Sequence, residues 1–146
     1  IDAPTPIQMQ GIPSILSGRD MIGVAYTGSG KTLVFVIPAI CFALEQEMTL
    51  PLESGEGPFC LIISPSRELA SQTATIIHKI AGELYRAGHP RIRELLITGG
   101  VPYQEQRNAI RDGVHIVVAT PGRLKEFLDR GEMSLHFCNY LVFDEA

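Results

Sequence analysis

The chain has 146 residues and a formal net charge of −4, with 45% apolar and 19% charged residues. This length suits one domain that buries roughly two-thirds of the surface its unfolded chain would expose. The acidic balance excludes a broadly basic surface that drives nonspecific nucleic-acid binding, so any such contact must be local. The longest apolar run falls well short of a membrane span and no stretch resembles a signal peptide, so we expect a soluble intracellular domain.

Three cysteines and four histidines are scattered along the sequence. The odd number of cysteines, each in an apolar segment, argues against a disulfide framework. The histidines show no metal-ligand spacing with each other or with cysteine. We therefore expect reduced cysteines in the core, and we expect any metal to arrive together with a bound ligand.

The first predicted strand is the apolar run Met21–Ala25, and it leads into a glycine-rich stretch and an apolar helical segment. The stretch reads Ala25, Tyr26, Thr27, Gly28, Ser29, Gly30, Lys31, Thr32. Strand, glycine-rich turn and helix in this order are typical of a phosphate-binding loop, because such a turn brings backbone N–H groups close to triphosphate oxygens. Ala25 departs from the general motif, which has glycine at that position. An ordinary turn before a helix is the alternative.

Two residues after the glycines add chemistry that an ordinary turn lacks. Lys31 can reach the outer phosphates as a point charge, and the Thr32 hydroxyl is placed to ligate Mg²⁺. The sequence therefore predicts a bound nucleoside triphosphate with Mg²⁺.

Further apolar, strand-like runs recur downstream, with helical patterns between them. They are Phe59–Ser64, Glu94–Thr98, His115–Thr120 and Tyr140–Asp144. This alternation predicts an α/β fold with a central parallel sheet flanked by helices. The continuous apolarity of residues 61–63 and 116–119 indicates central strands that are covered on both faces.

The segments between the strands have their own signals. We expect Pro38 to kink or break the helix after the phosphate loop. Glu47–Pro58, with two prolines and two glycines, is predicted to be an exposed loop. Residues 69–84 have helical spacing, and Gly88 offers a stop.

Two strand-to-helix junctions are near copies of each other. They read Ser64, Pro65, Ser66, Arg67 and Thr120, Pro121, Gly122, Arg123. Ser or Thr suits the N-cap and Pro suits the first helical position, so each arginine falls in the first turn, where the helix dipole disfavours a cation. The two arginines together predict a bound anion. The alternative is that they pair with nearby carboxylates such as Glu68 or Glu126.

The remaining strand ends contribute glycines and carboxylates. Gly99 and Gly100 open another backbone turn, although an ordinary turn is the alternative. In a parallel sheet all these junctions share one edge, where ligands of open α/β sheets bind.

The last strand delivers Asp144 and Glu145 to that edge. We interpret Asp144 as a ligand of Mg²⁺, directly or through water, and Glu145 as the group that activates the attacking water; solvated charge is the alternative.

In this order the motifs resemble the amino-terminal RecA-like domain of a DEAD-box RNA helicase, and the resemblance covers residues 1–146. In that family the phosphate loop begins with Ala, as it does at Ala25. Residues 4–8 resemble the glutamine motif, which implies that Gln8 reads the adenine edge and selects ATP. Residues 65–70, with Ser66 in place of Thr, resemble the first RNA-contacting motif.

Two further RNA-backbone motifs of the family are matched by Gly99–Gly100 and by Thr120–Arg123, and Asp144–Ala146 resembles the naming motif cut one residue short. The resemblance thus implies an ATP- and Mg²⁺-dependent enzyme that binds the RNA backbone without reading bases. The implied catalytic residues are Lys31, Asp144 and Glu145.

The resemblance also implies missing parts. The chain begins without Met and ends directly after an acidic pair, so we expect a fragment that lacks a second RecA-like domain and its arginine fingers. The isolated domain should then be nearly inactive. Details at residues 10–13, 16–21 and 45–58 look most like the Abstrakt subgroup, which implies a nuclear location, or otherwise a cytoplasmic one, and spliceosomal proteins as partners. A DNA-directed ATPase and a nucleotide-gated protein-binding module are the alternative functions.

Overall fold

The computed structural model describes residues 3–26 and 28–145. Helices and strands alternate along most of the chain. They are α1 (Pro6–Leu16), α2 (Lys31–Thr49), β1 (Cys60–Ile63), α3 (Arg67–Arg86), β2 (Glu94–Ile97), α4 (Tyr103–Asp112), β3 (Ile116–Ala119), α5 (Pro121–Asp129) and β4 (Tyr140–Phe143). The predicted α/β class is confirmed.

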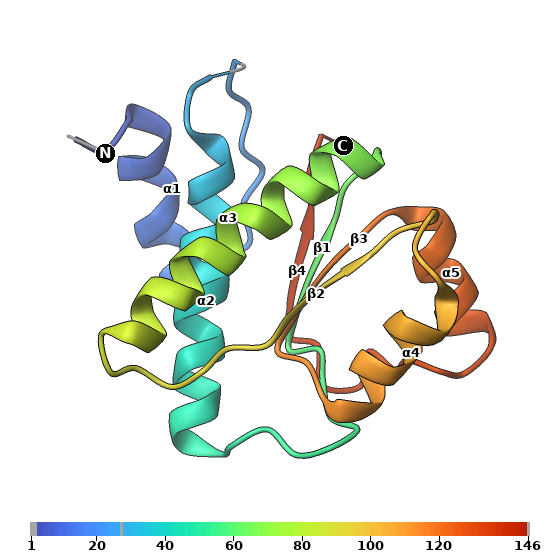
Figure 1. Cartoon of the computed structure of the whole chain (residues 1–146). Coiled ribbons are helices and arrows are strands. Elements are labelled where there is room, and N and C mark those ends of the chain that lie inside the picture. Colours follow the sequence, from blue (N-terminus) through green and yellow to red (C-terminus); the bar gives the residue numbers. More distant parts are fainter. Residues whose placement is uncertain (1–2, 27, 146) are drawn as a thin grey trace.

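The described strands form one four-stranded sheet in the order β2-β3-β1-β4, and every pairing is parallel. Parallel neighbours need a crossover connection, and α3, α4 and α5 supply the crossovers between successive strands. In register, Leu61 lies between Val117 and Leu141. Because all strands run the same way, their carboxyl ends lie at a single edge of the sheet (Figure 1).

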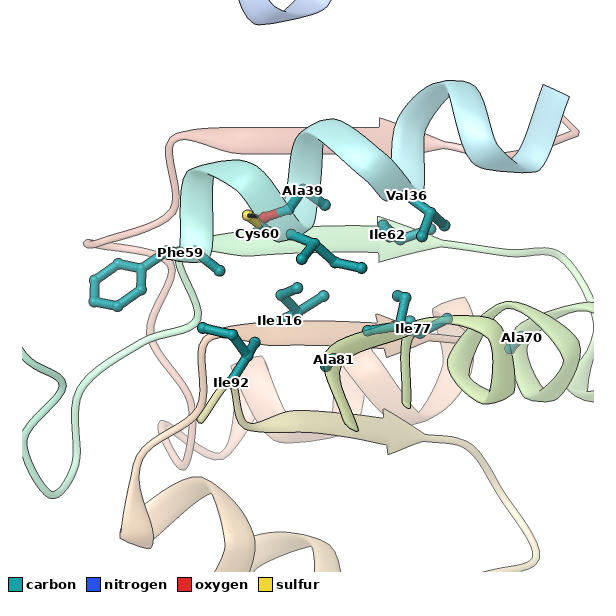
Figure 2. Close-up of a cluster of buried hydrophobic side chains, with 13 residues drawn as sticks. Val36, Ala39, Phe59, Cys60, Ile62, Ala70, Ile77, Ala81, Ile92 and Ile116 are labelled. Carbon is teal, nitrogen blue, oxygen red and sulfur yellow. Dashed lines mark hydrogen bonds between the residues drawn. The ribbon is translucent and has the colours of Figure 1, made fainter. Parts of the chain in front are cut away.

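Helices cover both faces of the sheet, as the continuous apolar runs predicted. Successive strand residues point to opposite faces, so Ile62 packs in the cluster beneath α2 and α3, whereas Leu61 packs in the cluster with α4 and α5. Figure 2 shows Val36 of α2 and Ile77 of α3 directed toward the strands of the first cluster. All four residues of β3 are buried. The predicted central, two-sided burial is therefore confirmed.

Helix α2 differs from the prediction in two ways. It runs through Pro38 without a break for 19 residues, and it ends at Thr49, so the loop expected from Glu47 starts later. Pro38 is buried, and the Tyr140 hydroxyl donates to the carbonyl oxygen of Phe35, three residues before it, at 2.8 Å. The helix therefore packs against β4 in the turn that contains the proline.

By length and composition alone α2 could also cross a membrane, with a mean hydropathy of 1.4. The core helix of a globular domain passes the same test. Ala39 and Ile40 of α2 are buried in the cluster with β1 and β3, and this packing accounts for the apolar sequence.

The predicted strand at Met21–Ala25 is wrong. The structure has neither helix nor strand there, and Ile22 and Val24 are 95% and 90% exposed. The segment is a coil between α1 and α2 (Figure 1), and among the described strands β4 pairs only with β1. An apolar run has the propensity for a strand, but a strand forms only where another edge accepts its backbone hydrogen bonds.

Candidate functional site

Backbone hydrogen bonds tie the carboxyl ends of the four strands together at one edge. The three bonds run from Asp144 N–H to the Ile63 carbonyl at 2.9 Å, from Ser64 N–H to the Ala119 carbonyl at 2.9 Å, and from Thr120 N–H to the Ile97 carbonyl at 3.0 Å. The residues that follow the strands are therefore fixed relative to one another. The predicted convergence of these junctions at one edge is confirmed.

The phosphate-loop residues end in a tight turn at the start of α2. Gly28 and Gly30 have φ of +85° and +82°, in the left-handed region that side chains rarely adopt. Gly30 is the N-cap of α2, so Lys31 and Thr32 lie in its first turn. Ser29 lies within the turn, between the two glycines, Ala25 precedes it, and Thr27 is outside the described residues.

Gln8 of α1 is buried against this turn. Its Nε2 donates to the Gly30 carbonyl oxygen at 3.0 Å, and its Oε1 accepts from the Thr5 N–H at 2.9 Å. A Cβ on Gly30 would lie 2.5 Å from Gln8 Nε2, so this contact also requires glycine. The predicted glutamine motif therefore contacts the predicted phosphate loop directly, and the role of Gln8 toward adenine stays a prediction.

The loop lysine is joined to the last strand by an ion pair. Lys31 Nζ lies 2.7 Å from Glu145 Oε1, and this hydrogen bond is the main cause that raises the pKa of Lys31. Asp144 is half-buried beside them. Burial, followed by the charge of Glu145, raises the pKa of Asp144, while Lys31 acts the other way. These three side chains, predicted to act together, are brought together.

The donor set fits Mg²⁺ bound with a nucleotide. A half-buried carboxylate beside a second carboxylate would be stabilised by a divalent cation, and the Thr32 hydroxyl adds a further oxygen in the first turn of α2. Within the described residues no group of three His, Cys, Asp or Glu side chains could hold a metal alone. Phosphate and water oxygens would have to complete the coordination. The buried Ser29 hydroxyl has no partner among the described residues, which also fits a polar ligand at the loop.

The first arginine junction is open to a ligand. Ser66, not Ser64, is the N-cap of α3, since its Oγ accepts from the Leu69 N–H at 3.2 Å, and Arg67 is the first helical residue. The Ser64 side chain is instead buried at the end of β1. Pro65, Ser66 and Arg67 are exposed.

The Arg67 guanidinium lies against the next strand's glycine turn. A Cβ on Gly99 or Gly100 would lie 3.0 Å or 2.8 Å from its terminal nitrogens. In the described part of the chain Arg67 forms no ion pair, so the alternative pairing with Glu68 is absent. A cation, a helix N-terminus and a glycine turn therefore meet at one exposed place.

The second arginine junction is partly closed. Thr120 is the N-cap and Pro121 the first residue of α5. Arg123 Nε lies 3.1 Å from Glu126 Oε2, so the carboxylate alternative holds for this arginine. Arg123 Nη1 also donates to the Val101 carbonyl oxygen at 2.9 Å, which ties this junction to the residue after Gly100. Pro121 and Gly122 remain exposed.

One residue of this edge was missed from the sequence. Gln106 of α4 is buried and accepts from Arg123 Nη1 at 2.9 Å. A signal existed, because Gln106 shares the buried face of α4 with Ile110, four residues on. A polar side chain on a buried helix face needs hydrogen-bond partners, but the sequence does not say which ones.

Comparisons with known proteins find matches that extend over nearly the whole chain. The DEAD/DEAH box helicase family matches residues 5–146. The chain is 58% identical over 146 residues to the ATP-dependent RNA helicase abstrakt of Drosophila melanogaster. This match covers 100% of the chain and 24% of the Drosophila protein.

Two solved structures are similar. The yeast DEAD-box splicing factor Prp28 has a TM-score of 0.86 and 34% identity, and the RNA helicase Prp28 from Chaetomium thermophilum bound to ADP has a TM-score of 0.83 and 40% identity. Each match covers 99% of this chain and 33% of the solved chain. The chain thus spans a quarter to a third of the length of these relatives. Since the family match extends from the glutamine motif through the acidic strand end, the chain belongs to the DEAD/DEAH box helicase family.

Proposed function

We propose that residues 1–146 form the amino-terminal RecA-like domain of an ATP-dependent RNA helicase. The domain binds ATP with Mg²⁺ at one half of the sheet edge and the RNA backbone at the other half. It hydrolyses ATP together with a second RecA-like domain, and the cycle unwinds short RNA duplexes or remodels RNA–protein complexes. The observation that carries the proposal is the Lys31–Glu145 ion pair at the same sheet edge as the exposed contact of Arg67 with Gly99 and Gly100.

The nucleotide half supplies charge, donors and a base. The N–H groups at Gly28 and Gly30 and the Lys31 ammonium bind phosphate oxygens, and Gln8 holds the loop in place through the Gly30 carbonyl. Bound Mg²⁺ neutralises phosphate charge, and Thr32 and Asp144 would hold it. Glu145, released from Lys31 by the phosphates, orients the attacking water and accepts its proton.

The RNA half has donors that suit phosphates rather than bases. Arg67 is exposed and without an ion-pair partner among the described residues, and the turn at Gly99 and Gly100 leaves the backbone accessible. Contacts to phosphates and 2′-hydroxyls are independent of sequence. The local placement of these groups is compatible with the net charge of −4.

The relatives support a finer proposal about biology. One similar solved structure is of a DEAD-box splicing factor, and the Drosophila relative is the abstrakt helicase. We infer that the whole protein acts in the nucleus, in pre-mRNA splicing, with spliceosomal proteins as partners. Enrichment of spliceosomal RNA with the tagged full-length protein, and its loss on Arg67→Ala, would test this.

The experiment that tests the proposed function measures ATP hydrolysis by the full-length protein with and without nucleic acid. We expect stimulation by single-stranded RNA and none by DNA of the same sequence, because only RNA offers 2′-hydroxyl contacts. Equal stimulation by DNA would favour a DNA-directed ATPase. Nucleotide binding without stimulated turnover, and with no effect of Glu145→Gln on function, would favour a nucleotide-gated protein-binding module. The isolated domain should hydrolyse ATP barely or not at all.

A further inference from the structure

The buried amide of Gln106 links two of the strand-to-helix turns at the sheet edge. The side chain is 2% exposed, and its Nε2 donates to the carbonyl oxygens of Thr98 at 3.0 Å and Leu96 at 3.4 Å. Its Oε1 accepts from Arg123 Nη1 at 2.9 Å. These partners fix the orientation of the amide, because a flipped amide would turn its Nε2 toward the Arg123 guanidinium and its Oε1 toward two carbonyl oxygens.

The two ends of this amide bracket the turn at Gly99 and Gly100. Thr98 directly precedes the turn, and Arg123 Nη1 also donates to the carbonyl oxygen of Val101, directly after it, at 2.9 Å. On the outer side, the Arg67 guanidinium lies against both glycines. Gln106 thus holds the inner side of a turn whose outer side faces the exposed arginine.

The same contacts determine which donors of Arg123 remain free. Its Nε is used by Glu126 and its Nη1 by Gln106 and Val101, and the guanidinium lies 5.7 Å from the centre of the Tyr103 ring. Within the described residues the Nη2 group has no hydrogen-bond partner. A guanidinium has five N–H donors, so the two on Nη2 are the unpaired ones, on a side chain that is 15% exposed. Without Gln106, Nη1 would lose one of its two acceptors.

We propose that Gln106 is a positioning residue for RNA binding, which acts by holding Arg123 and the Gly99–Gly100 turn in one arrangement. The inference rests on the proposed RNA-binding function of this edge. Gln106 itself is buried and contacts no RNA. Leucine at this position removes both contacts, whereas glutamate keeps an acceptor for Arg123 and loses the donors to Thr98 and Leu96.

The test is a double-mutant cycle in the full-length protein. Binding of a fluorescent single-stranded RNA is measured by anisotropy over a salt series, with a non-hydrolysable ATP analogue, for Gln106→Leu, Arg123→Ala and the double variant. Gln104→Leu is the matched control, because Gln104 is on the same helix but exposed, with its amide bonded to Asn108. Nucleotide affinity and urea unfolding of each variant are measured in parallel.

We expect Gln106→Leu to weaken RNA binding about tenfold and to reduce the slope of log affinity against log salt by about 0.7, the value of one lost phosphate contact. In the Arg123→Ala background it should add less than about twofold, because coupled residues are not additive. Nucleotide affinity and the Gln104→Leu control should stay at wild-type values. Equal losses in both backgrounds, or no loss in a folded variant, would overturn the inference.

Two results separate this inference from the function on which it rests. If Arg123→Ala leaves RNA affinity and salt slope unchanged, the proposed RNA site at this turn is wrong, and the inference falls with it. If Arg123→Ala weakens binding but Gln106→Leu acts additively, only the inference is wrong. Should Gln106→Leu fail to fold, Gln106→Glu replaces it. Because glutamate keeps the acceptor for Arg123 but loses the bonds to Thr98 and Leu96, its RNA affinity and salt slope should lie between those of the wild type and of Arg123→Ala. Wild-type values of both, or a loss as large as that of Arg123→Ala, would overturn the inference.

Discussion

Lys31 and Glu145, which lie 114 positions apart in the chain numbering, form an ion pair with Nζ and Oε1 at 2.7 Å. Both side chains are partly exposed, 31% and 44%, so a ligand can reach and separate them. The lysine proposed to bind phosphate is therefore held by the carboxylate proposed to activate water. In the proposed site, a phosphate that takes up Lys31 would release Glu145, which would link occupation of the loop to the carboxylate proposed to activate water.

Replacing Glu145 by glutamine should separate nucleotide binding from turnover. Glu145→Gln keeps the shape of the side chain but removes its charge, so ATP hydrolysis by the full-length protein should fall by at least about a hundredfold. ATP affinity should be retained or rise roughly two- to fivefold, since Lys31 loses an exposed ion pair. Fluorescent-nucleotide titration and steady-state hydrolysis measure the two quantities. Lys31→Ala is the opposite case and should lose nucleotide binding; retained turnover in Glu145→Gln would contradict the assigned role.

Removing the Arg67 side chain should weaken RNA binding and spare ATP binding. Arg67 is exposed and unpaired within the described residues, so its loss costs the fold little. Arg67→Ala should reduce the salt slope of single-stranded RNA binding by about 0.7. Arg86→Ala is the matched control, because Arg86 ends the same helix and pairs with Glu83. Equal RNA affinity of the two variants at matched salt would refute the role of Arg67.

A glycine in the loop after α2 should tolerate no side chain. Gly57 has φ of +91°, and a Cβ there would lie 1.7 Å from the Val114 carbonyl oxygen. Gly57→Ala should lower the free energy of unfolding by about 3 kcal/mol, from overpacking and backbone strain together. Gly55→Ala is the control, since Gly55 has φ of +83° but open space around it, and should cost about 1 kcal/mol. Urea unfolding that shows equal losses would exclude the steric contribution.

Stability should fall on mild acidification because of His115. His115 is 1% exposed, and its Nδ1 accepts from the Arg93 N–H. The neutral ring therefore carries its hydrogen on Nε2, which donates to Glu47 Oε2 at 2.7 Å. Burial lowers the pKa of His115, although the bond to Glu47 opposes this. The unfolded chain therefore binds a proton more readily, and stability is lost as pH falls below about 6.5.

The pKa of Glu47 is also lowered, because hydrogen bonds from Leu52 and His115 outweigh its burial, so its contribution is lost at still lower pH. Urea unfolding from pH 8 to pH 5 measures the slope. In His115→Gln the loss near pH 6 should disappear. A wild-type stability that rises on acidification would contradict the neutral state of His115.

The fold class and the sheet edge were predictable from the sequence because they depend on local patterns. Continuous apolarity indicated the buried strands, and the order of strand, turn and helix indicated that Arg67 and Arg123 would meet at one edge. The predictions that failed each depend on a tertiary partner that the local sequence does not specify. The strand at Met21–Ala25 would need a neighbouring strand edge, and Ser64 would be an N-cap only if α3 began two residues earlier. Gln106 is satisfied by carbonyl groups at the end of β2, which the sequence of α4 does not reveal. Such partners are fixed by tertiary structure and leave only weak local signals.

The proposed ligand site is the sheet edge formed by the carboxyl ends of the strands. Hydrogen exchange of the full-length protein tests this placement most directly. With a non-hydrolysable ATP analogue we expect slower exchange at residues 25–32 and 144–145, and with added RNA at residues 65–68, 99–101 and 121–124. The opposite edge, at residues 91–94 and 113–115, should be unchanged by either ligand. Protection at that opposite edge, or none at the arginine junctions when RNA is bound, would contradict the proposed site.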